Sequence, residues 1–463
     1  MRRTQAHKDA VPPLRMGEER TFSVETVTQE GEGLSRGDGF VVFVPGALPG
    51  ERVRARVVQL KRDYARAELL ALESASPDRT PPPCPVYGRC GGCTLQHATY
   101  EAQLRYKEAF VRDALRRLAQ IPEPPVLPIC GAKEPWRYRN KVQMVAGGSP
   151  GALRVGYYAR GTHAFVPVDD CLLAPEEFAS LAAEAAKILN AFGLAPYDEA
   201  RRTGFVRHLV LRKSFAYGEL MLVLVTARRE FPQGQAFARE LVRRFPALVS
   251  VWQNVQPRPT NFVFGDEARL LYGRETLRER LGELELDVTY RSFLQVNTRQ
   301  AEVLYREVEA LGEFRPEDEV AEAYSGIGSL SLWLARKVRR VSGVEVVAEA
   351  VRDARENARK NGIANAEFHL GRAEEVFPRW AEAGRRADVV VVNPPRKGLP
   401  PEMIRAAAAL SPRAVVYVSC NPATLARDVA RFREHGYDLQ VVRPVDLFPQ
   451  TGHVESVAVL RRA

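Results

Sequence analysis

The sequence has few cysteines and no long apolar segment. Six cysteines are spread over 463 residues, whereas a disulfide scaffold would be far denser, so a metal site or catalysis is the better use for them. No run of about 18 apolar residues occurs, which excludes an ordinary membrane-spanning helix. The segment 1–15 is polar and lacks the apolar stretch of a signal peptide. We therefore expect a cytoplasmic protein without a membrane partner.

Internal repeats and low-complexity tracts are also missing. Hydrophobic residues make up 45% and charged residues 27% of the chain, which excludes a disordered or collagen-like protein. The length predicts roughly two to four domains. Lys and Arg number 67 against 57 Asp and Glu, a net charge of +10. This surplus fits a polyanionic partner, usually nucleic acid, and equally fits a soluble enzyme with a basic surface.

Residues 1–18 resemble a loose polar leader, and short strand-like runs separated by glycine-rich turns follow from Arg20 to Ser76. We assign residues 15–76 to one N-terminal domain. The runs are Thr21–Val27, Gly39–Val44, Arg52–Leu60 and Tyr64–Leu72. Their spacing predicts a small β-barrel of the OB type. Basic side chains such as Arg52, Arg54 and Arg56 lie along the strands, as expected for a barrel that binds single-stranded nucleic acid. A solvated basic face without a ligand is the alternative.

The remainder of the chain divides into two further domains. Residues 77–285 show a mixed α+β pattern, with apolar spacing that predicts helices over Tyr100–Leu118, Pro175–Phe192 and Gln233–Phe245. Residues 286–463 alternate strands and helices, which predicts a parallel, doubly wound, Rossmann-like sheet. The expected fold class is therefore multidomain, with an N-terminal barrel, a central α+β domain and a C-terminal α/β domain.

A glycine-containing turn follows the predicted strand Asp318–Ala323. Gly326 and Gly328, between this strand and a helix, allow close approach of a ligand to the helix N-terminus. Glu345 ends the next strand, where a carboxylate can hold both ribose hydroxyls of a nucleoside cofactor. Serine stands at position 331, where a dinucleotide-binding loop has its third glycine. This favours S-adenosylmethionine, which has no phosphate to cradle; a purely structural turn is the alternative.

Asn393-Pro-Pro-Arg396 follows the strand Asp388–Val392, at the edge where doubly wound sheets bind ligands. The two prolines restrict the backbone, and the Asn393 amide can both donate and accept hydrogen bonds. Arg396 and Lys397 are candidates to hold phosphate. A rigid loop without a ligand is the alternative.

Cys420 follows the strand Ala414–Ser419 and precedes a predicted helix start. Positive helix-terminal dipoles are expected to lower the pKa of this thiol, which makes it a candidate nucleophile. Glu455 opens the last strand after the loop Phe448–Gly452, and a carboxylate facing the same pocket is a candidate general base. An inert buried cysteine and a surface glutamate are the alternatives.

Four cysteines give a separate signal. Cys84, Cys90 and Cys93 follow the pattern C-x5-C-x2-C, and Cys171 lies further along the chain. Thiolates at this spacing can surround zinc or an iron–sulfur cluster, and the spacing alone does not separate the two. Cys130 is an alternative fourth ligand, and unligated cytoplasmic thiols are the remaining interpretation.

Together these motifs resemble the bacterial RNA uracil-5-methyltransferase family over about residues 18–463. The barrel is similar to a TRAM domain, and the cysteine pattern is similar to the 4Fe–4S site of the branch that acts on 23S rRNA. The remaining motifs in family order are Tyr138-Arg-Asn-Lys141, Ser292-Phe-x-Gln295-x-Asn297, Tyr324-Ser-Gly-x-Gly328, Gly343-Val-Glu345, Asn393-Pro-Pro-Arg, Ser419-Cys-Asn-Pro and His453-Val-Glu455.

The resemblance implies a monomeric enzyme that methylates uracil C5 in RNA, here expected to be 23S rRNA, using S-adenosylmethionine. Cys420 would form a covalent bond to uracil C6, and Glu455 would be the base. Phe293 is a candidate surface for stacking the flipped base, and Arg137, Arg139 and Lys141 for phosphate contacts. The implied ligands are Gln295, Tyr324, Glu345 and Asn393 for the cofactor and Cys84, Cys90, Cys93 and Cys171 for a [4Fe-4S] cluster.

The sequence also departs from the family pattern. Glu322 and Asn393 stand where Asp is usual, Ser325 replaces a common Cys, and Arg372 lies where an acidic residue often meets adenosine. We therefore assign no adenine ligand. The alternatives are the same reaction on tRNA, a non-catalytic RNA-binding ribosome-assembly factor, and methylation of an exocyclic nitrogen. The last uses a motif with an aromatic residue where Arg396 stands.

Overall fold

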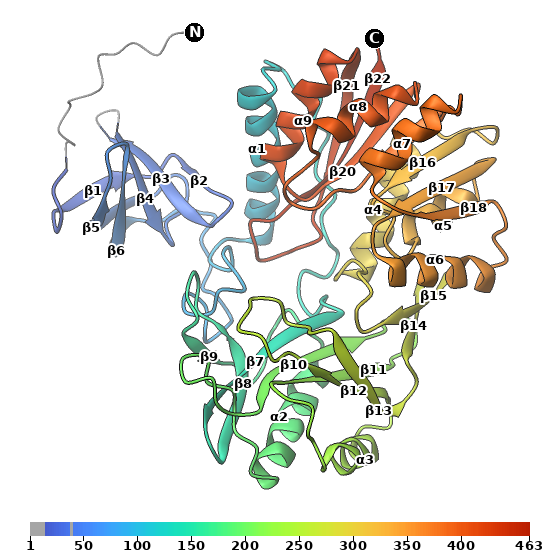
Figure 1. Ribbon diagram of the computed structural model, residues 1–463. Helices are drawn as coiled ribbons and strands as arrows, with labels where there is room; N and C mark the ends of the chain where they lie inside the picture. The colour runs from blue at the N-terminus through green and yellow to red at the C-terminus, as the bar shows by residue number, and fades with distance from the viewer. Residues whose placement is uncertain (1–13, 38–39) are drawn as a thin grey trace. The chain divides into compact units, whose positions relative to one another are not determined.

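A computed structural model of the protein describes residues 14–37 and 40–463 (Figure 1). Most of the expected leader and Gly39, where a strand was expected to begin, lie outside the described residues. The chain forms two compact units. The first unit comprises the chain up to Gly88 together with Gly92–Phe110 and Phe448–His453. The second comprises Arg89–Gly91, Val111–Leu447 and Val454–Ala463.

A six-stranded sheet dominates the first unit. Its strand order is β1-β5-β6-β4-β3-β2, so the two edge strands are consecutive in the chain. In β5, buried and exposed side chains alternate, because successive side chains of a strand point to opposite faces. Val53 and Ala55 are buried, whereas Arg52, Arg54 and Arg56 are exposed. The bounds are β1 (Glu19–Ser23), β2 (Thr26–Val27), β3 (Glu32–Gly37), β4 (Phe40–Pro45), β5 (Arg52–Leu60) and β6 (Tyr64–Ser74).

A segment from the far end of the chain completes the first unit. It packs on α1 (Tyr100–Leu118), a helix whose predicted bounds are confirmed. The Gln103 side chain donates to the Gln450 side-chain oxygen at 3.0 Å and accepts from the Gln450 backbone N–H at 2.9 Å. The buried ammonium of Lys107 donates to the Phe448 carbonyl at 2.9 Å. Buried polar groups need such partners, so these bonds fix the loop that leads toward Glu455.

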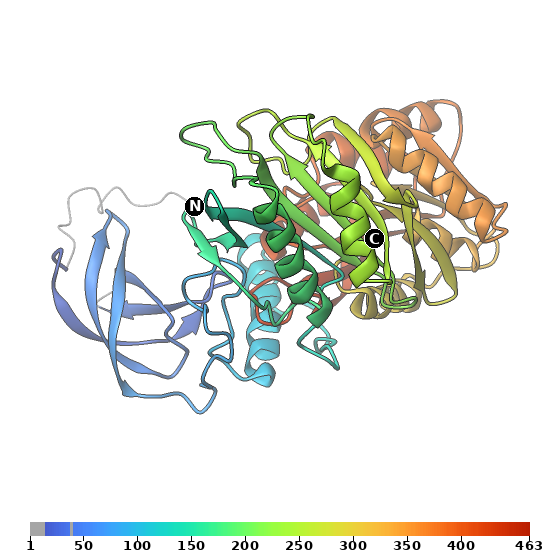
Figure 2. The same ribbon diagram turned by 90° about the horizontal axis from the view of Figure 1, so that it is seen from below.

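The second unit contains a mixed central sheet with the order β13-β12-β11-β10-β7-β8-β9. The helices α2 (Glu176–Ala191) and α3 (Gly234–Arg244) lie side by side on one of its faces (Figure 2). Both begin and end within one residue of their predicted bounds, and the α+β pattern is confirmed. The strands are β7 (Lys141–Ser149), β8 (Ala152–Tyr158), β9 (Phe165–Pro167), β10 (Val206–Lys213), β11 (Leu220–Thr226), β12 (Leu248–Val255) and β13 (Glu267–Gly273).

Strand β11 is buried throughout, and apolar up to its final Thr226, because both of its faces are covered. Leu222 and Leu224 pack under the helices, whereas Val223 packs with Leu277 and Tyr290 on the opposite face. Leu277 belongs to a hairpin that the sequence reading did not identify. Its strands are β14 (Thr276–Leu281) and β15 (Leu284–Thr289).

A seven-stranded sheet follows, in the order β18-β17-β16-β19-β20-β22-β21. The prediction of a wholly parallel sheet is wrong, because β22 runs antiparallel to both of its neighbours. The chain passes from β21 to β22 without a crossover helix, so it reverses direction. The bounds are β16 (Glu319–Ala323), β17 (Arg340–Glu345), β18 (Ala366–Leu370), β19 (Val389–Val392), β20 (Ala414–Ser419), β21 (Tyr437–Val445) and β22 (Glu455–Arg462).

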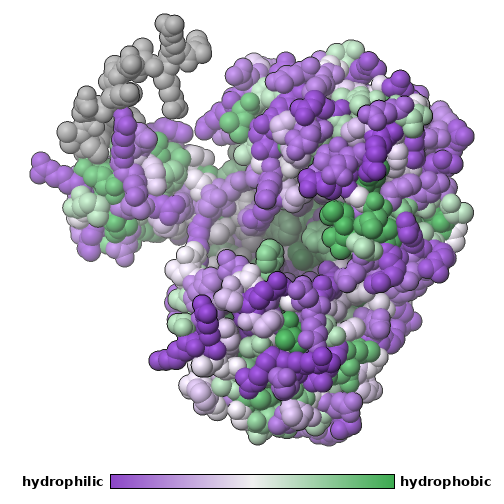
Figure 3. Space-filling view, viewed as in Figure 1, coloured by the Kyte–Doolittle hydropathy of each residue, from purple (hydrophilic) through white to green (hydrophobic). Residues whose placement is uncertain are grey.

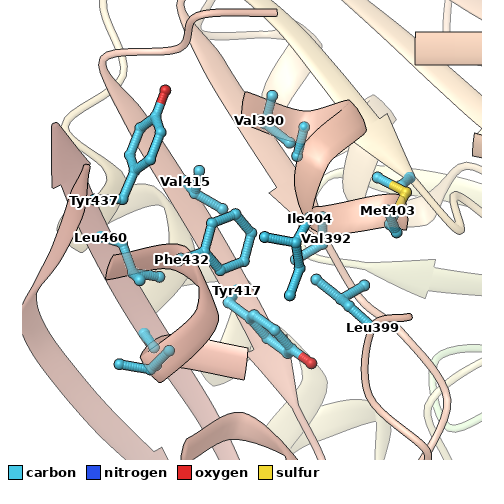
Figure 4. Packing of buried hydrophobic residues seen from close by; sticks show 14 of the residues in the cluster. Val390, Val392, Leu399, Met403, Ile404, Val415, Tyr417, Phe432, Tyr437 and Leu460 are labelled. Atoms are coloured by element: carbon cyan, nitrogen blue, oxygen red, sulfur yellow. The ribbon is translucent and has the colours of Figure 1, made fainter. Parts of the chain in front are cut away.

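Helices cover both faces of this sheet. The second half of α1 packs with α7, α8 and α9 in one apolar core, where Val392 and Tyr417 lie near Phe432 (Figure 4). The opposite face carries α4, α5 and α6. The bounds are α4 (Thr298–Gly312), α5 (Ser329–Ala335), α6 (Ala348–Lys360), α7 (Ala373–Glu382), α8 (Pro401–Ala409) and α9 (Pro422–Glu434). None of the helices in the described part of the chain combines the length and apolarity needed to cross a membrane.

Candidate active site

The order of the seven-stranded sheet brings the motif residues to one edge. Glu345 ends β17, Tyr324 follows β16, Asn393 follows β19 and Cys420 follows β20, and these four parallel strands are successive neighbours. Because β22 runs the other way, its first residue, Glu455, also lies at this edge. Ser456, the next residue of β22, pairs with Ser419 of β20, immediately before Cys420. The topology therefore joins five of the six expected catalytic and cofactor positions.

The turn after β16 has the backbone of a close ligand contact. Tyr324, Gly326 and Gly328 have φ values of +63°, +53° and +79°. Only glycine adopts such values without a steric cost, so the backbone of Tyr324 is strained. A Cβ atom on Gly328 would lie 2.7 Å from the ring of Phe368. Glycine is thus required at position 328, immediately before α5, because neighbouring side chains fill the space of a Cβ atom. At Gly326 nothing lies within 4 Å of the Cβ position, so the turn is open there.

The carboxylate of Glu345 is held by backbone donors. One oxygen accepts from the N–H of Gly326 at 3.0 Å, and the other accepts from Val346 at 2.8 Å and Val347 at 2.9 Å. These bonds fix its direction and leave lone pairs for further donors. Val346 is 61% exposed and Leu370, paired with Glu345 across the strands, is 57% exposed. These two exposed apolar side chains beside Glu345 were not predicted from the sequence. The available signal was an apolar residue at the end of each strand, where polar loop residues are usual.

Two buried polar side chains lie beneath this turn. Burial, together with the charge of Glu345, raises the pKa of Glu322 to about 8, and the Ser331 hydroxyl donates to its carboxyl. The hydroxyl of Ser325 is buried and has no hydrogen-bond partner in the part of the chain that the structure describes. An unsatisfied buried hydroxyl beside an open glycine turn is an environment suited to a small polar ligand. These residues fit S-adenosylmethionine.

A buried aspartate supports the loop that carries Asn393 and Arg396. Asp428 accepts from the Leu399 backbone N–H at 2.7 Å and from the Tyr417 hydroxyl at 2.8 Å. The half-buried amide of Asn393 makes no hydrogen bond within the described residues, so its donors and acceptor are available to a ligand. The loop is therefore fixed from below and keeps its polar groups at the sheet edge.

Cys420, Glu455 and Arg396 form an electrostatic cluster. Burial, with a contribution from the charge of Glu455, raises the pKa of the Cys420 thiol to about 11, and Arg396 acts in the opposite direction. The prediction of a lowered thiol pKa is therefore wrong: α9 does begin two residues later, but burial and the carboxylate outweigh its dipole. Arg396, a candidate to hold phosphate, lies close enough to the thiol to favour its ionised form.

Glu455 is almost completely buried, with 4% of its surface exposed. Burial raises the pKa of its carboxyl to about 7, although the positive charge of Arg396 opposes the shift. At neutral pH the carboxyl is therefore close to half ionised, which is the condition in which a general base or acid works best. The cluster combines a thiol, a carboxyl and a guanidinium group at one edge of the sheet.

The remaining motif residues lie in the loop before α4. Gln295 is buried, and its carbonyl accepts from the Asn140 side chain at 2.8 Å, but no contact among the described residues joins its side chain to the cluster. Phe293 in the same loop is 67% exposed. Arg212, buried in β10, donates to the Ser292 carbonyl at 2.9 Å and so fixes the backbone beside Phe293.

The four cysteines expected to hold a cluster are divided between the two units. Cys84 and Cys93 belong to the first unit, and Cys90 and Cys171 to the second. Within the second unit, both Cys90 and Cys171 influence the buried hydroxyl of Tyr157. Among the described residues no group of three or more Cys, His, Asp or Glu side chains is arranged to hold a metal ion. The geometry of the described residues gives no support to the iron–sulfur prediction.

Comparison with known protein families gives two matches. Residues 265–463 match the model of the tRNA (uracil-5-)-methyltransferase family, and residues 13–70 match the TRAM domain. An uncharacterized RNA methyltransferase of Halalkalibacterium halodurans is 42% identical over 448 residues, covering 97% of this chain and 98% of the relative. A similar protein of Bacillus cereus is 42% identical over 451 residues, with the same coverage.

A solved structure agrees with these sequence relatives. The Pyrococcus abyssi tRNA (uracil-54, C5)-methyltransferase, in complex with S-adenosyl-L-homocysteine, is 28% identical and superimposes with a TM-score of 0.76. The match covers 95% of this chain and 99% of that one. With identity of 42% to relatives over nearly the whole length, the chain belongs to the RNA uracil-5-methyltransferase family, whose members use S-adenosylmethionine.

Proposed function

We propose that the protein methylates C5 of a uridine in RNA through a transient covalent bond between Cys420 and uracil C6. The observation that carries this proposal is the cluster of Cys420, Glu455 and Arg396 at the sheet edge that also bears the Gly326 turn. An enzyme that methylates an exocyclic nitrogen needs no thiol there. A non-catalytic RNA-binding factor needs neither the thiol nor a buried carboxyl with its pKa near neutrality.

The chemistry explains why both groups are needed. C5 of uracil is a poor nucleophile until the Cys420 thiolate adds to C6 and turns the ring into an enolate. S-adenosylmethionine, when bound, supplies an electrophilic methyl group, which C5 attacks. Glu455 then removes the proton from C5, the ring regains its double bond, and the Cys420 thiolate leaves. General-base help of this kind typically contributes about 10²–10⁴ in rate.

Positive charge prepares the thiol for this reaction. A thiol with its pKa near 11 is almost entirely protonated at neutral pH, so the free state is protected from adventitious reaction. Arg396 already favours the thiolate, and a sulfonium bound at this edge would add a second positive charge. The reactive thiolate therefore forms chiefly in the presence of the methyl donor.

Different residues around the turn contact different parts of S-adenosylmethionine, the methyl donor. Glu345, held by its backbone donors, takes the ribose hydroxyls, and the exposed Val346 and Leu370 offer an apolar surface to the adenine ring. Tyr324 and Asn393 line the pocket, and Gln295 contacts the methionine end. These assignments rest on the position of each residue at the sheet edge or, for Gln295, on its motif.

We propose 23S rRNA as the substrate, and transfer RNA as the second candidate. A TRAM domain with exposed arginines along β5 gives the chain a surface for RNA phosphates. The tRNA alternative is favoured by the name of the solved relative from Pyrococcus abyssi. The iron–sulfur cluster stays a prediction of the sequence alone.

Replacing Cys420 by alanine should abolish methyl transfer, because C5 is not activated without the thiolate. S-adenosylmethionine should still bind, since no donor contact is lost. The measurement is transfer of radiolabelled methyl to RNA, with calorimetry for the donor. Cys130→Ala is the matched control, since Cys130 is also half-buried with its pKa raised to about 11. Full turnover by Cys420→Ala would exclude the covalent mechanism.

Glu455→Gln should trap the covalent protein–RNA intermediate, because the methylated ring cannot lose its C5 proton. The adduct is measured as a slowly migrating band on a denaturing gel. Turnover should fall by about 10²–10⁴, the usual contribution of a general base. The control is Glu434→Gln at the exposed end of α9, which should leave no adduct. A variant at position 455 that turns over freely would contradict the assignment of the base.

Release of methylated RNA should depend on pH through Glu455. The base acts in its ionised form, so the single-turnover rate of adduct breakdown should fall about tenfold for each pH unit below 7 and level off above it. Rapid-quench measurements across this range, with product separated from adduct, give the profile. The inflection should persist in Glu434→Gln; a flat wild-type profile would show that another group takes the proton.

The RNA target is decided by a cellular measurement. In a strain that lacks the protein, one uridine of 23S rRNA should lose its 5-methyl group while tRNA keeps its own, and mass spectrometry of digested RNA reports both. Loss confined to tRNA would instead establish the second candidate. The Cys420→Ala variant should not restore the modification, whereas Cys130→Ala should restore it.

A further inference from the structure

The loop between β12 and β13, residues 256–266, presents the most exposed large apolar side chain of the described residues. Phe262 at its tip is 78% exposed. Isolated exposed apolar residues are common and need no explanation by themselves. Here, however, buried side chains hold the loop in a fixed shape. Figure 3 shows hydrophobic areas in green on a largely hydrophilic surface.

Three buried polar side chains hold this loop in shape. The Gln256 side chain donates to the carbonyls of Phe262 and Phe264 at 3.1 and 3.0 Å. Asn254 donates to the Gly265 carbonyl at 3.0 Å and accepts from its N–H at 2.8 Å. Arg207 donates to the Gln256 carbonyl at 3.2 Å. All three side chains are at least 96% buried, so the loop is a fixed support and the exposure of Phe262 is part of its structure.

A second exposed aromatic lies on the neighbouring loop. Arg291, two residues before the exposed Phe293, donates to the carbonyls of Gly265 and Asp266 at 2.7 and 3.0 Å. The rings of Phe264 and Tyr290 also pack edge to face, with centroids 5.2 Å apart. These contacts tie the loop that carries Phe262 to the loop that carries Phe293.

Two cations lie where the loops meet. The ammonium of Lys141 is 5.3 Å from the centroid of Phe264 and makes one long hydrogen bond, 3.5 Å, to the Tyr290 carbonyl. Burial, together with the charge of Arg212, lowers the pKa of Lys141 to about 7, so a bound anion would favour its charged form. Arg291 lies at the same junction, because it donates to the Tyr290 hydroxyl and to the Gly265 carbonyl. The junction of the two loops that carry the exposed aromatic rings therefore holds two positive charges. That is the pattern by which proteins hold successive nucleotides of a single strand.

We propose that Phe262 stacks on an unpaired nucleobase of the RNA next to the target uridine, with Lys141 and Arg291 contacting the intervening phosphate. This inference rests on the proposed function, because it takes the target uridine to be flipped out, with Phe293 as the candidate surface for that base. The two aromatic loops would grip the strand on both sides of one phosphate and so keep the target nucleotide extruded. Stacking makes no demand on base identity, since every base has a π face.

The test is binding of a fluorescein-labelled single-stranded oligouridylate, measured by anisotropy in the Cys420→Ala background. That background separates this test from the covalent mechanism. Phe262→Ala should weaken binding by about 5- to 100-fold, the usual effect of removing one stacked base, and Phe262→Tyr should bind as the parent does. Tyr272→Ala, which removes an exposed ring of the adjoining strand β13, should leave the affinity unchanged. Lys141→Met should reduce the slope of log affinity against log salt by about 0.7.

The stacking proposal fails if RNA affinity does not follow the aromatic ring at position 262. Unchanged affinity in Phe262→Ala excludes stacking, and a loss that Phe262→Tyr does not restore assigns the ring a structural role. A change in the oligomeric state of Phe262→Ala with unchanged RNA affinity would assign the ring to a contact between copies of the chain. If Phe262→Ala weakens binding while Cys420 proves dispensable for methylation, the RNA surface stands and the covalent mechanism fails.

Discussion

The burial of Glu455 beside Cys420 is the constraint on which the site depends. A carboxyl shielded from water, with only Arg396 opposing the effect, has its pKa near neutrality, and its charge in turn raises the pKa of the thiol. Neither group would be useful alone: an exposed carboxylate is too weak a base, and an isolated thiol lacks a partner to complete the reaction. The shared electrostatic environment places a thiol and a carboxyl at one edge of the sheet, the two groups that the proposed mechanism uses in turn as nucleophile and base.

Strand direction makes this pairing possible. In a wholly parallel sheet the last strand would begin at the opposite edge, far from Cys420. Because β22 is antiparallel, its first residue reaches the edge where β20 ends. The loop before it, Phe448–His453, belongs to the first unit and is fixed by Gln103 and Lys107. In the chain, only Val454 therefore separates His453, the last residue of this loop, from Glu455.

Sequence patterns predicted the positions of helices and strands better than the electrostatic surroundings of the site residues. Continuous apolar runs such as Val389–Val392 and the spacing of Tyr100–Leu118 predicted strand and helix correctly, since local periodicity reports burial. The thiol pKa of Cys420 was predicted with the wrong sign, because burial and the approach of Glu455 arise from tertiary packing. The support under Phe262 joins side chains of two strands and is invisible in a linear reading.

Charge at the sheet edge also gives a physical reason for Asn393. Burial and the negative charge of Glu345 already raise the pKa of Glu322 at this edge to about 8. β19 lies between β16 and β20, so a carboxylate at position 393 would add negative charge between these groups and the Cys420 cluster. That charge would raise the pKa of Cys420 and Glu455 further and oppose the thiolate. An amide keeps one acceptor oxygen and exchanges the other for an N–H donor without adding charge. In the proposed mechanism this leaves Arg396 and the bound methyl donor to favour the thiolate.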